Sequence, residues 1–287
     1  MIFPLLVENL YRFLPNQMTF TMKKYALFTL ITLAGFIVSC NNPDAFPEFE
    51  DPQNCDGGTF TGVARLRTQA EVDAFGANCY RQIDGGLIIG PNEGASDDIT
   101  NLEALFSVEQ IYASDPAVGQ GKLNIINTNN LTNLEGLDNL VQVAGLLISN
   151  NQEIINLGGL ESLITCTNEG AFNDVIVSNN PKIASLIGLN NLTQVGTDDS
   201  GIPTAVTIQA NPLLTTLSGF DNLLTVYGTV TIGSFQEASI LGLGNSSLTN
   251  LCSLSNLISN GVYTSANIYN NAYNPTAQDI IDGNCSQ

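Results

Sequence analysis

Apolar residues recur at every third position in several segments of this chain, and a short apolar run precedes each segment. In SNNPKIASLIGLNNLTQVG, residues Ser178–Gly196, this spacing runs from Ile183 to Val195. An amphipathic helix needs apolar residues alternately three and four positions apart, and the Asn-Asn-Pro triplet also breaks helices. The pattern therefore argues against a helix and raises the question of whether it repeats.

Four copies of the segment align on a Gly-Leu or Gly-Phe pair at Gly136, Gly159, Gly188 and Gly219, with spacings of 23, 29 and 31 residues. Five apolar columns result. They contain Leu131, Ile154, Ile183 and Leu214; Leu134, Leu157, Leu186 and Leu217; Leu137, Leu160, Leu189 and Phe220; Leu140, Leu163, Leu192 and Leu223; and Val143, Cys166, Val195 and Val226. A weaker copy spans Ile99–Ile111. Internal repeats outrank local propensity in predicting architecture.

Each copy follows a short run with the character of a β-strand. The runs end at Ile125, Ile148, Val177 and Ile208, and a further run ends at Ile232. Three positions after the first four ends stand Thr128, Asn151, Asn180 and Asn211. Asparagine tolerates the left-handed backbone region and bonds nearby backbone groups, so we expect these residues to build corners rather than to bind a ligand.

One coil of 23 residues with a single clear strand cannot bury its own apolar face, whereas stacked coils share a continuous core. The sequence therefore predicts an all-β fold, a right-handed parallel β-solenoid spanning residues 58–287. We expect disulfides to seal both exposed ends, one between Cys55 and Cys79 and one between Cys252 and Cys285. Cys166 stands in an apolar column and is expected to be a buried free thiol.

The repeat L-x-I-x-x-N-x-x-L-x-x-L-x-G-L-x-N-L-x-x-V resembles that of the receptor L-domain family, a relative of leucine-rich repeats, and most of all its bacterial lipoprotein branch. The flanking segments Thr61–Gly90 and Asn271–Cys285 are similar to the same branch. The resemblance covers residues 58–287 and implies a leucine-rich-repeat type of solenoid. It implies no single function, because members of the family bind varied partners.

The N-terminal region carries a targeting pattern. Residues 22–39 combine Lys23 and Lys24 with an apolar stretch, and Ser39-Cys40 ends it like a bacterial lipobox. We expect cleavage before Cys40 and lipidation of its thiol, with residues 40–57 as an acidic, proline-rich tether. Residues 1–21 fit no targeting segment, which favours Met22 as the start. The expected location is the cell envelope, anchored to the outer membrane by lipid alone.

Composition narrows the classes of function. The formal net charge is −19, with no basic cluster for nucleic acid. The chain contains no histidine, which removes the usual general base and the commonest zinc ligand. No phosphate-binding or dinucleotide motif is present, so we expect neither a cofactor nor an enzyme.

Three insertions separate a fifth-column residue from the next strand, at Tyr112–Lys122, Thr167–Asp174 and Gly196–Ala205. All three should leave the solenoid at the same corner, where loops can form a binding surface or simply tolerate length. Asp115, Asp198 and Asp199 in these loops are candidate ligand contacts. The pairs Asp97-Asp98 and Asp198-Asp199 could hold calcium, although solvated loop charges explain them more simply.

The sequence thus predicts a non-catalytic surface lipoprotein that recognises a protein or a glycan. The absence of tryptophan favours a protein partner. A structural envelope scaffold is the alternative, and a polysaccharide-cleaving solenoid enzyme ranks third.

Overall fold

The computed structural model describes residues 57–115, 117–167, 174–198, 204–234 and 244–287, which all belong to one compact unit, Cys55–Gln287. The expected signal peptide and lipidation site, Cys40, lie outside the described residues, as do Cys55 and Asp199. No helix in the described part of the chain is long and apolar enough to cross a membrane.

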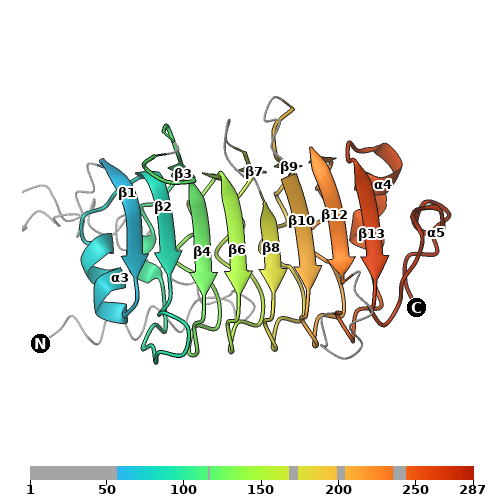
Figure 1. Ribbon diagram of the computed structural model, residues 1–287, viewed down its shortest axis with the longest axis horizontal. Helices are drawn as coiled ribbons and strands as arrows, with labels where there is room; N and C mark the ends of the chain where they lie inside the picture. The colour runs from blue at the N-terminus through green and yellow to red at the C-terminus, as the bar shows by residue number, and fades with distance from the viewer. Residues whose placement is uncertain (1–56, 116, 168–173, 199–203, 235–243) are drawn as a thin grey trace, which may run out of the picture. The chain divides into compact units, whose positions relative to one another are not determined.

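Thirteen parallel strands form one open sheet that runs along the unit (Figure 1). Long strands form one row: β1 (Thr59–Leu66), β2 (Gln82–Ile89), β4 (Lys122–Ile126), β6 (Gly145–Ser149), β8 (Val175–Ser178), β10 (Thr204–Gln209), β12 (Gly228–Gly233) and β13 (Ser265–Tyr269). Short strands form the other row: β3 (Gln110–Tyr112), β5 (Gln142–Val143), β7 (Thr165–Cys166), β9 (Gln194–Val195) and β11 (Thr225–Val226). Each coil therefore adds a short and then a long strand, which is the stacking predicted for a parallel β-solenoid.

Strand β2 joins the two rows. Residues Gln82–Asp84 pair with β3, and Gly86–Ile89 pair with β4. Between them Gly85 has φ +145°, and a Cβ placed there would lie 2.1 Å from the carbonyl oxygen of Gly62 on β1. Only glycine can turn the strand at this point while β1 packs against it.

The three-residue spacing comes from consecutive tight turns on the side of each coil without strands. In one coil Leu137 donates its N–H to the oxygen of Leu134, and Leu140 donates to Leu137, at 3.1 and 2.9 Å. Each such turn brings every third side chain to the same side. All twenty residues of the five predicted columns are fully buried, which confirms the predicted register.

The glycine of each Gly-Leu or Gly-Phe pair is required by coil stacking. Gly136, Gly159, Gly188 and Gly219 have φ values between +108° and +122°. A Cβ at these positions would lie 2.0–2.1 Å from a carbonyl oxygen of the neighbouring coil. Both the backbone conformation and the lack of space exclude a side chain.

The corner asparagines form a buried ladder. Asn180 donates its side-chain N–H groups to the oxygens of Ile148 and Ser178, each at 3.0 Å, and also contacts Asn211 Oδ1 at 3.2 Å. The series runs through Thr128, Asn151, Asn180, Asn211, Asn245 and Asn271. The expected structural role is confirmed, because these side chains bond the backbone of adjacent coils.

A left-handed backbone was expected at the ladder residues themselves. This expectation is wrong, because the left-handed conformation occurs one position earlier in the chain. Positive φ values of 55–60° occur at the preceding residues, Asn127, Asn150, Asn179, Ala210 and Asn270. At these five corners the turn is therefore shared between two residues, whereas Gly244, which precedes Asn245, has no positive φ. The first turns the chain through the left-handed region, and the second points its amide inward.

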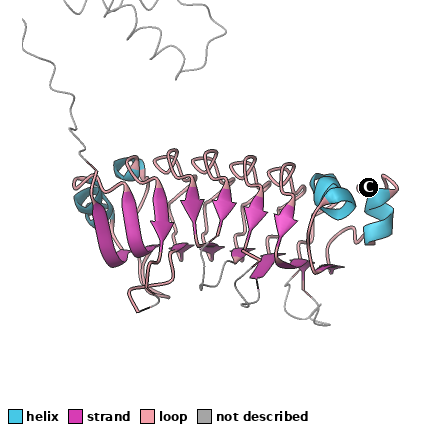
Figure 2. Ribbon diagram, turned by 90° about the horizontal axis from the view of Figure 1, so that it is seen from above, coloured by secondary structure: helices cyan, strands magenta, loops and turns pink. Residues whose placement is uncertain are grey.

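Short helices occupy the two ends of the array, as Figure 2 shows. They are α3 (Gln69–Gly76), the 3-10 turns η1 (Glu103–Leu105) and η2 (Cys252–Leu254), α4 (Ser255–Asn260) and α5 (Ala277–Ile281). The prediction of an all-β chain omitted them. They are too short for a periodic apolar pattern, although Thr276 and Asp279 do form a capping box at α5.

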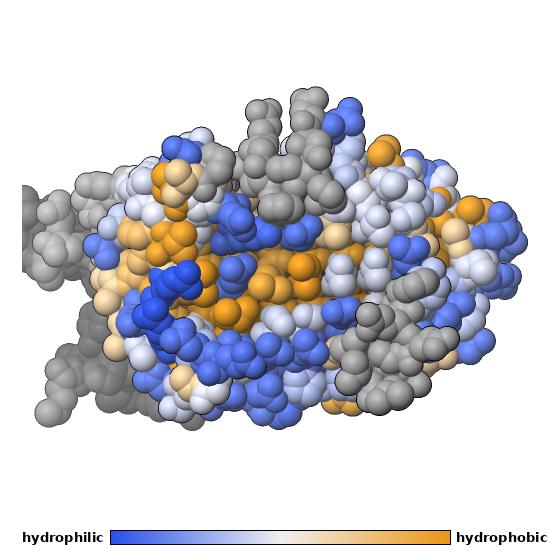
Figure 3. Space-filling model, viewed as in Figure 1, coloured by the Kyte–Doolittle hydropathy of each residue, from blue (hydrophilic) through white to orange (hydrophobic). Residues whose placement is uncertain are grey.

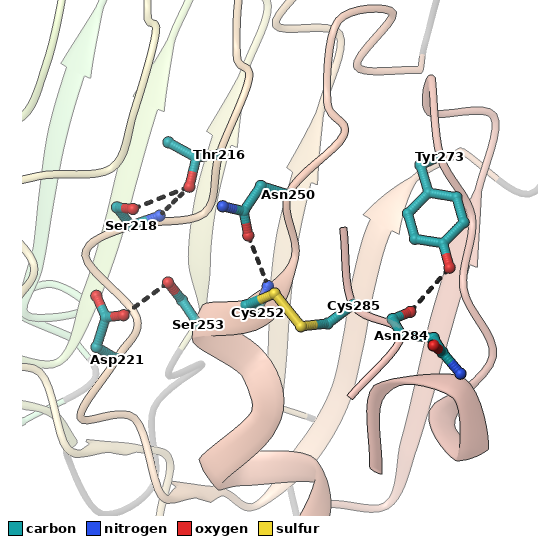
Figure 4. The surroundings of a disulfide bond; sticks show 9 residues. All are labelled: Thr216, Ser218, Asp221, Asn250, Cys252, Ser253, Tyr273, Asn284 and Cys285. Carbon is teal, nitrogen blue, oxygen red and sulfur yellow. Dashed lines mark hydrogen bonds between the residues drawn. A yellow bond between two sulfur atoms is a disulfide. The ribbon is translucent and has the colours of Figure 1, made fainter. Parts of the chain in front are cut away.

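The C-terminal disulfide forms as predicted. Cys252 and Cys285 are bonded, with Cα atoms 4.9 Å apart (Figure 4). Around the bridge, Ser253 donates to Asp221 of the preceding coil at 2.8 Å, and the Tyr273 hydroxyl donates to the Asn284 oxygen at 2.8 Å. At the other end Cys79 is also disulfide-bonded. Cys166 is free and fully buried, as predicted.

Candidate binding surfaces

The outward side of the long strands carries an apolar surface that Asn124 on β4 interrupts. We call Val63, Ile88, Ile126, Leu147 and Ile176 the apolar band, because these outward side chains come from five neighbouring long strands. Figure 3 shows hydrophobic surface crossing the strands, with hydrophilic surface along both borders. Val63 is 40% exposed, and the other four are partly exposed. Toward the C-terminal end Thr207 and Thr231 continue the register.

One border of the band holds an ion pair that crosses a strand. Lys122 Nζ on β4 lies 3.6 Å from Oδ2 of Asp174, the residue immediately before β8. Gly145, which is in register with Lys122 on the intervening strand β6, has no side chain to block the path. Asp174 also accepts the Ala205 N–H at 3.0 Å, so these contacts connect β4, β8 and β10.

The side-chain oxygen of Asn124, which lies within the band, is a hydrogen-bond acceptor without a donor. Asn124 points outward between Ile88 and Leu147 in the strand register. Its Oδ1 is buried and receives no hydrogen bond from the described residues. Buried polar atoms are normally paired, so this oxygen is an unsatisfied acceptor beneath the apolar band.

The predicted corner loops all connect a short strand to the long strand of the same coil, as their spacing indicated. The first loop is fixed at its start, because Ser114 donates its N–H and its hydroxyl to Asp84, at 2.8 and 2.5 Å. Asp115 Oδ1 accepts the Ala117 N–H at 2.8 Å and so closes a local turn. Asp198 is exposed. The structure thus gives Asp115 a local partner and brings it into no cluster with Asp198.

The carboxylates of Asp97 and Asp98 accept hydrogen bonds from other residues of the chain. Asp97 accepts hydrogen bonds from Asn129 and Asn130, and Asp98 accepts the Gln69 N–H at 2.8 Å. These contacts attach the loop to the neighbouring coils. Within the described residues no group of three or more His, Cys, Asp or Glu side chains is positioned to hold a metal ion.

Cys166 does not offer a nucleophile at the surface. Its side chain is fully buried, and this burial raises the thiol pKa well above its ordinary range. The thiolate is the reactive form, so a buried, protonated thiol is inert.

A concave surface lies where the long strands end. This amide groove has a volume of about 770 Å³ and opens at the corner with left-handed backbone. Asn150, Asn179, Pro181, Ala210, Pro212 and Asn270 are among its lining residues. The sequence interpretation missed it, since it assigned the asparagines a purely structural role. The paired Asn-Asn motifs at 150–151 and 179–180 are the signal, because only one residue of each pair can point inward.

Comparison of the chain with protein-family models, with curated proteins and with solved structures returned no match.

Proposed function

We propose that this chain is a non-catalytic recognition module that binds a protein partner on the apolar band of its long strands. The proposal depends chiefly on the outward hydrophobic surface crossing five strands. Contiguous exposed apolar patches rimmed by polar groups mark interaction sites, and protein interfaces combine an apolar centre with a polar rim.

A further feature supports a protein rather than a glycan at this face. No aromatic side chain points outward from the described part of β2, β4, β6, β8, β10 or β12, so a sugar ring would find no stacking platform there.

The finer architecture belongs to the same proposal. We infer a right-handed solenoid of receptor L-domain type with disulfide-sealed ends, since the repeat L-x-I-x-x-N-x-x-L-x-x-L-x-G-L resembles that family. Disulfide-bonded Cys79 and the Cys252–Cys285 bridge support sealed ends. Rigid stacked coils would present the apolar band without rearrangement on binding.

Localisation at the cell envelope is proposed from the sequence of residues 22–40. Replacing Cys40 with Ala should abolish fatty-acid labelling and retention in the membrane fraction. A variant that still carries the label and stays with the membrane contradicts the proposed anchor.

The binding face can be tested by comparing two exposed apolar positions on different sides of the coils. A photo-crosslinking residue at Leu147 should capture a partner from intact cells, and Leu147→Asp should then abolish binding of that purified partner. Ile164, which is 48% exposed beside the short strands, provides the control Ile164→Asp. Equal loss of binding in both folded variants, or no loss in Leu147→Asp, contradicts the proposed face.

A further inference from the structure

The amide groove contains a row of residues that share one backbone conformation. Asn150, Asn179, Ala210 and Asn270 line the groove and have φ values between 55° and 60°. Asparagine occupies this conformation more readily than most residues, which explains its use at three of the four positions. Ala210 shows that the corner forms without the amide, so the asparagine side chains are not needed for the turn.

The side-chain amides of Asn150 and Asn179 are available to a ligand, unlike those of the buried ladder beside them. Asn150 and Asn179 are exposed. Within the described residues the side chain of Asn179 makes no hydrogen bond at all, and Asn150 donates only to Asn127 Oδ1, at 3.3 Å. Each amide offers both donors and acceptors. Asn270 donates to the Ser234 oxygen at 2.6 Å. The groove therefore presents amides with unused hydrogen-bonding groups at the two successive coils that carry Asn150 and Asn179.

The groove is neutral in a strongly acidic chain. None of its lining residues is Asp, Glu, Lys or Arg, although the formal net charge of the chain is −19. Glu153 and Lys182, which follow the lining residues Gln152 and Pro181, form an ion pair between neighbouring coils and do not line the groove. A charged ligand would find no opposite charge here, whereas a neutral ligand would keep its hydrogen bonds on entering.

We propose that the amide groove binds a neutral glycan lying along the axis of the coils. Adjacent coils stand about 4.8 Å apart, the spacing of neighbouring strands, and one pyranose ring spans a similar distance along a chain. Hydroxyl groups donate and accept hydrogen bonds, as side-chain amides do. Pro181 and Pro212 add apolar ring surfaces against which the C–H faces of sugars can pack. An extended peptide fits less well, because its side-chain repeat on one face exceeds the coil spacing.

This site is separate from the apolar band, so its failure would leave the proposed protein-binding face untouched. The folded chain would be titrated with neutral hexasaccharides of β-1,4-glucan, β-1,3-glucan, β-1,4-mannan and xylan. Hexagalacturonate and an uncharged hexapeptide serve as comparators. We expect saturable binding of at least one neutral glycan, seen as localised chemical-shift changes at Asn150, Asn179 and Ala210.

Substitution assigns the binding to the amides. Asn179→Gly keeps the left-handed backbone and removes the amide, and it should weaken the glycan by about two- to tenfold, the effect of one hydrogen bond. Ala210→Gly is the matched control, because Ala210 lines the groove in the same conformation (φ 55°) but carries no amide. Absence of binding by all four glycans, equal binding of hexagalacturonate, preference for the peptide, or equal weakening by Ala210→Gly would each overturn the proposal.

Discussion

Asn180 Oδ1 accepts two hydrogen bonds from Asn151 on the adjacent coil, one from its backbone N–H and one from its side-chain Nδ2, each at 3.1 Å. The same pair of contacts recurs between Asn180 and Asn211. Because the amide of each coil satisfies groups on both neighbours, the ladder connects the coils through the interior, where no water can replace a lost partner.

Replacing Asn180 with Ala should therefore destabilise the protein. The substitution removes the acceptor of the buried Asn151 N–H and the side-chain donor to the Ile148 oxygen, and one unsatisfied group costs about 1–3 kcal/mol. The adjacent Asn179→Gly should change the free energy of unfolding by no more than about 0.5 kcal/mol, since Asn179 is exposed. Urea denaturation of both variants measures the difference, and similar values would contradict a structural ladder.

Alanine substitution at the adjacent glycines Gly158 and Gly159 should change the free energy of unfolding by very different amounts. Gly159 has φ +108°, and its added Cβ would lie 2.0 Å from the Leu134 oxygen, so Gly159→Ala should cost more than about 2 kcal/mol. The nearest atom to a Cβ at Gly158 is Asn156 Oδ1, a side-chain atom at 3.0 Å. Gly158→Ala should be nearly neutral. Thermal and urea unfolding of the pair test this, and equal costs would contradict the stacking geometry.

The sequence predicted the interior well because burial on the turn side depends only on spacing within one coil. Every third residue points inward, and a constant spacing is visible in a single sequence. The glycine that anchors the alignment was visible for the same reason, although its cause, contact with the carbonyl of the next coil, needs the structure.

The apolar band and the amide groove could not be predicted from residue spacing within one coil. Ile88, Leu147 and Ile176 occur within the uniformly apolar runs LII, LLI and VIV, where no alternation separates the inward from the outward side. Their alignment depends on register between coils separated by insertions of different lengths. The amide groove was hidden for a related reason, because the two residues of an Asn-Asn pair look alike in sequence and differ only in backbone conformation.

Cys166 should resist thiol reagents in the folded protein. Burial raises its pKa, so the thiol stays protonated and out of contact with the reagent. Maleimide labelling should be slow in buffer and complete in denaturant. Because the pKa is raised in the folded state, stability should decline as pH rises above the ordinary thiol pKa of about 8.5, where the unfolded chain loses its proton first.

Cys166→Val provides the control for this pH dependence. The same column holds Val143, Val195 and Val226, so valine suits the site, and the variant should fold with a change below about 1.5 kcal/mol. It should also lose the decline in stability attributed to the thiol at high pH. Rapid labelling of folded wild type, or an unchanged decline in Cys166→Val, would contradict the buried assignment.

The bond between Cys252 and Cys285 should stabilise the last coils rather than the whole array. It closes a separation of 33 residues, for which loop-closure entropy gives about 3–4 kcal/mol. In stacked repeats each coil depends mainly on its neighbours, so replacing both cysteines with Ala should loosen β13 and α5 first.

Amide hydrogen exchange should therefore accelerate at Ser265–Ile281 and stay unchanged at β6, which lies several coils away. Intact Ser253–Asp221 and Tyr273–Asn284 hydrogen bonds are expected to limit the effect to local opening. Uniform acceleration across the sheet would show instead that the coils unfold as one unit, and no acceleration at β13 would show that the bridge does not secure this end.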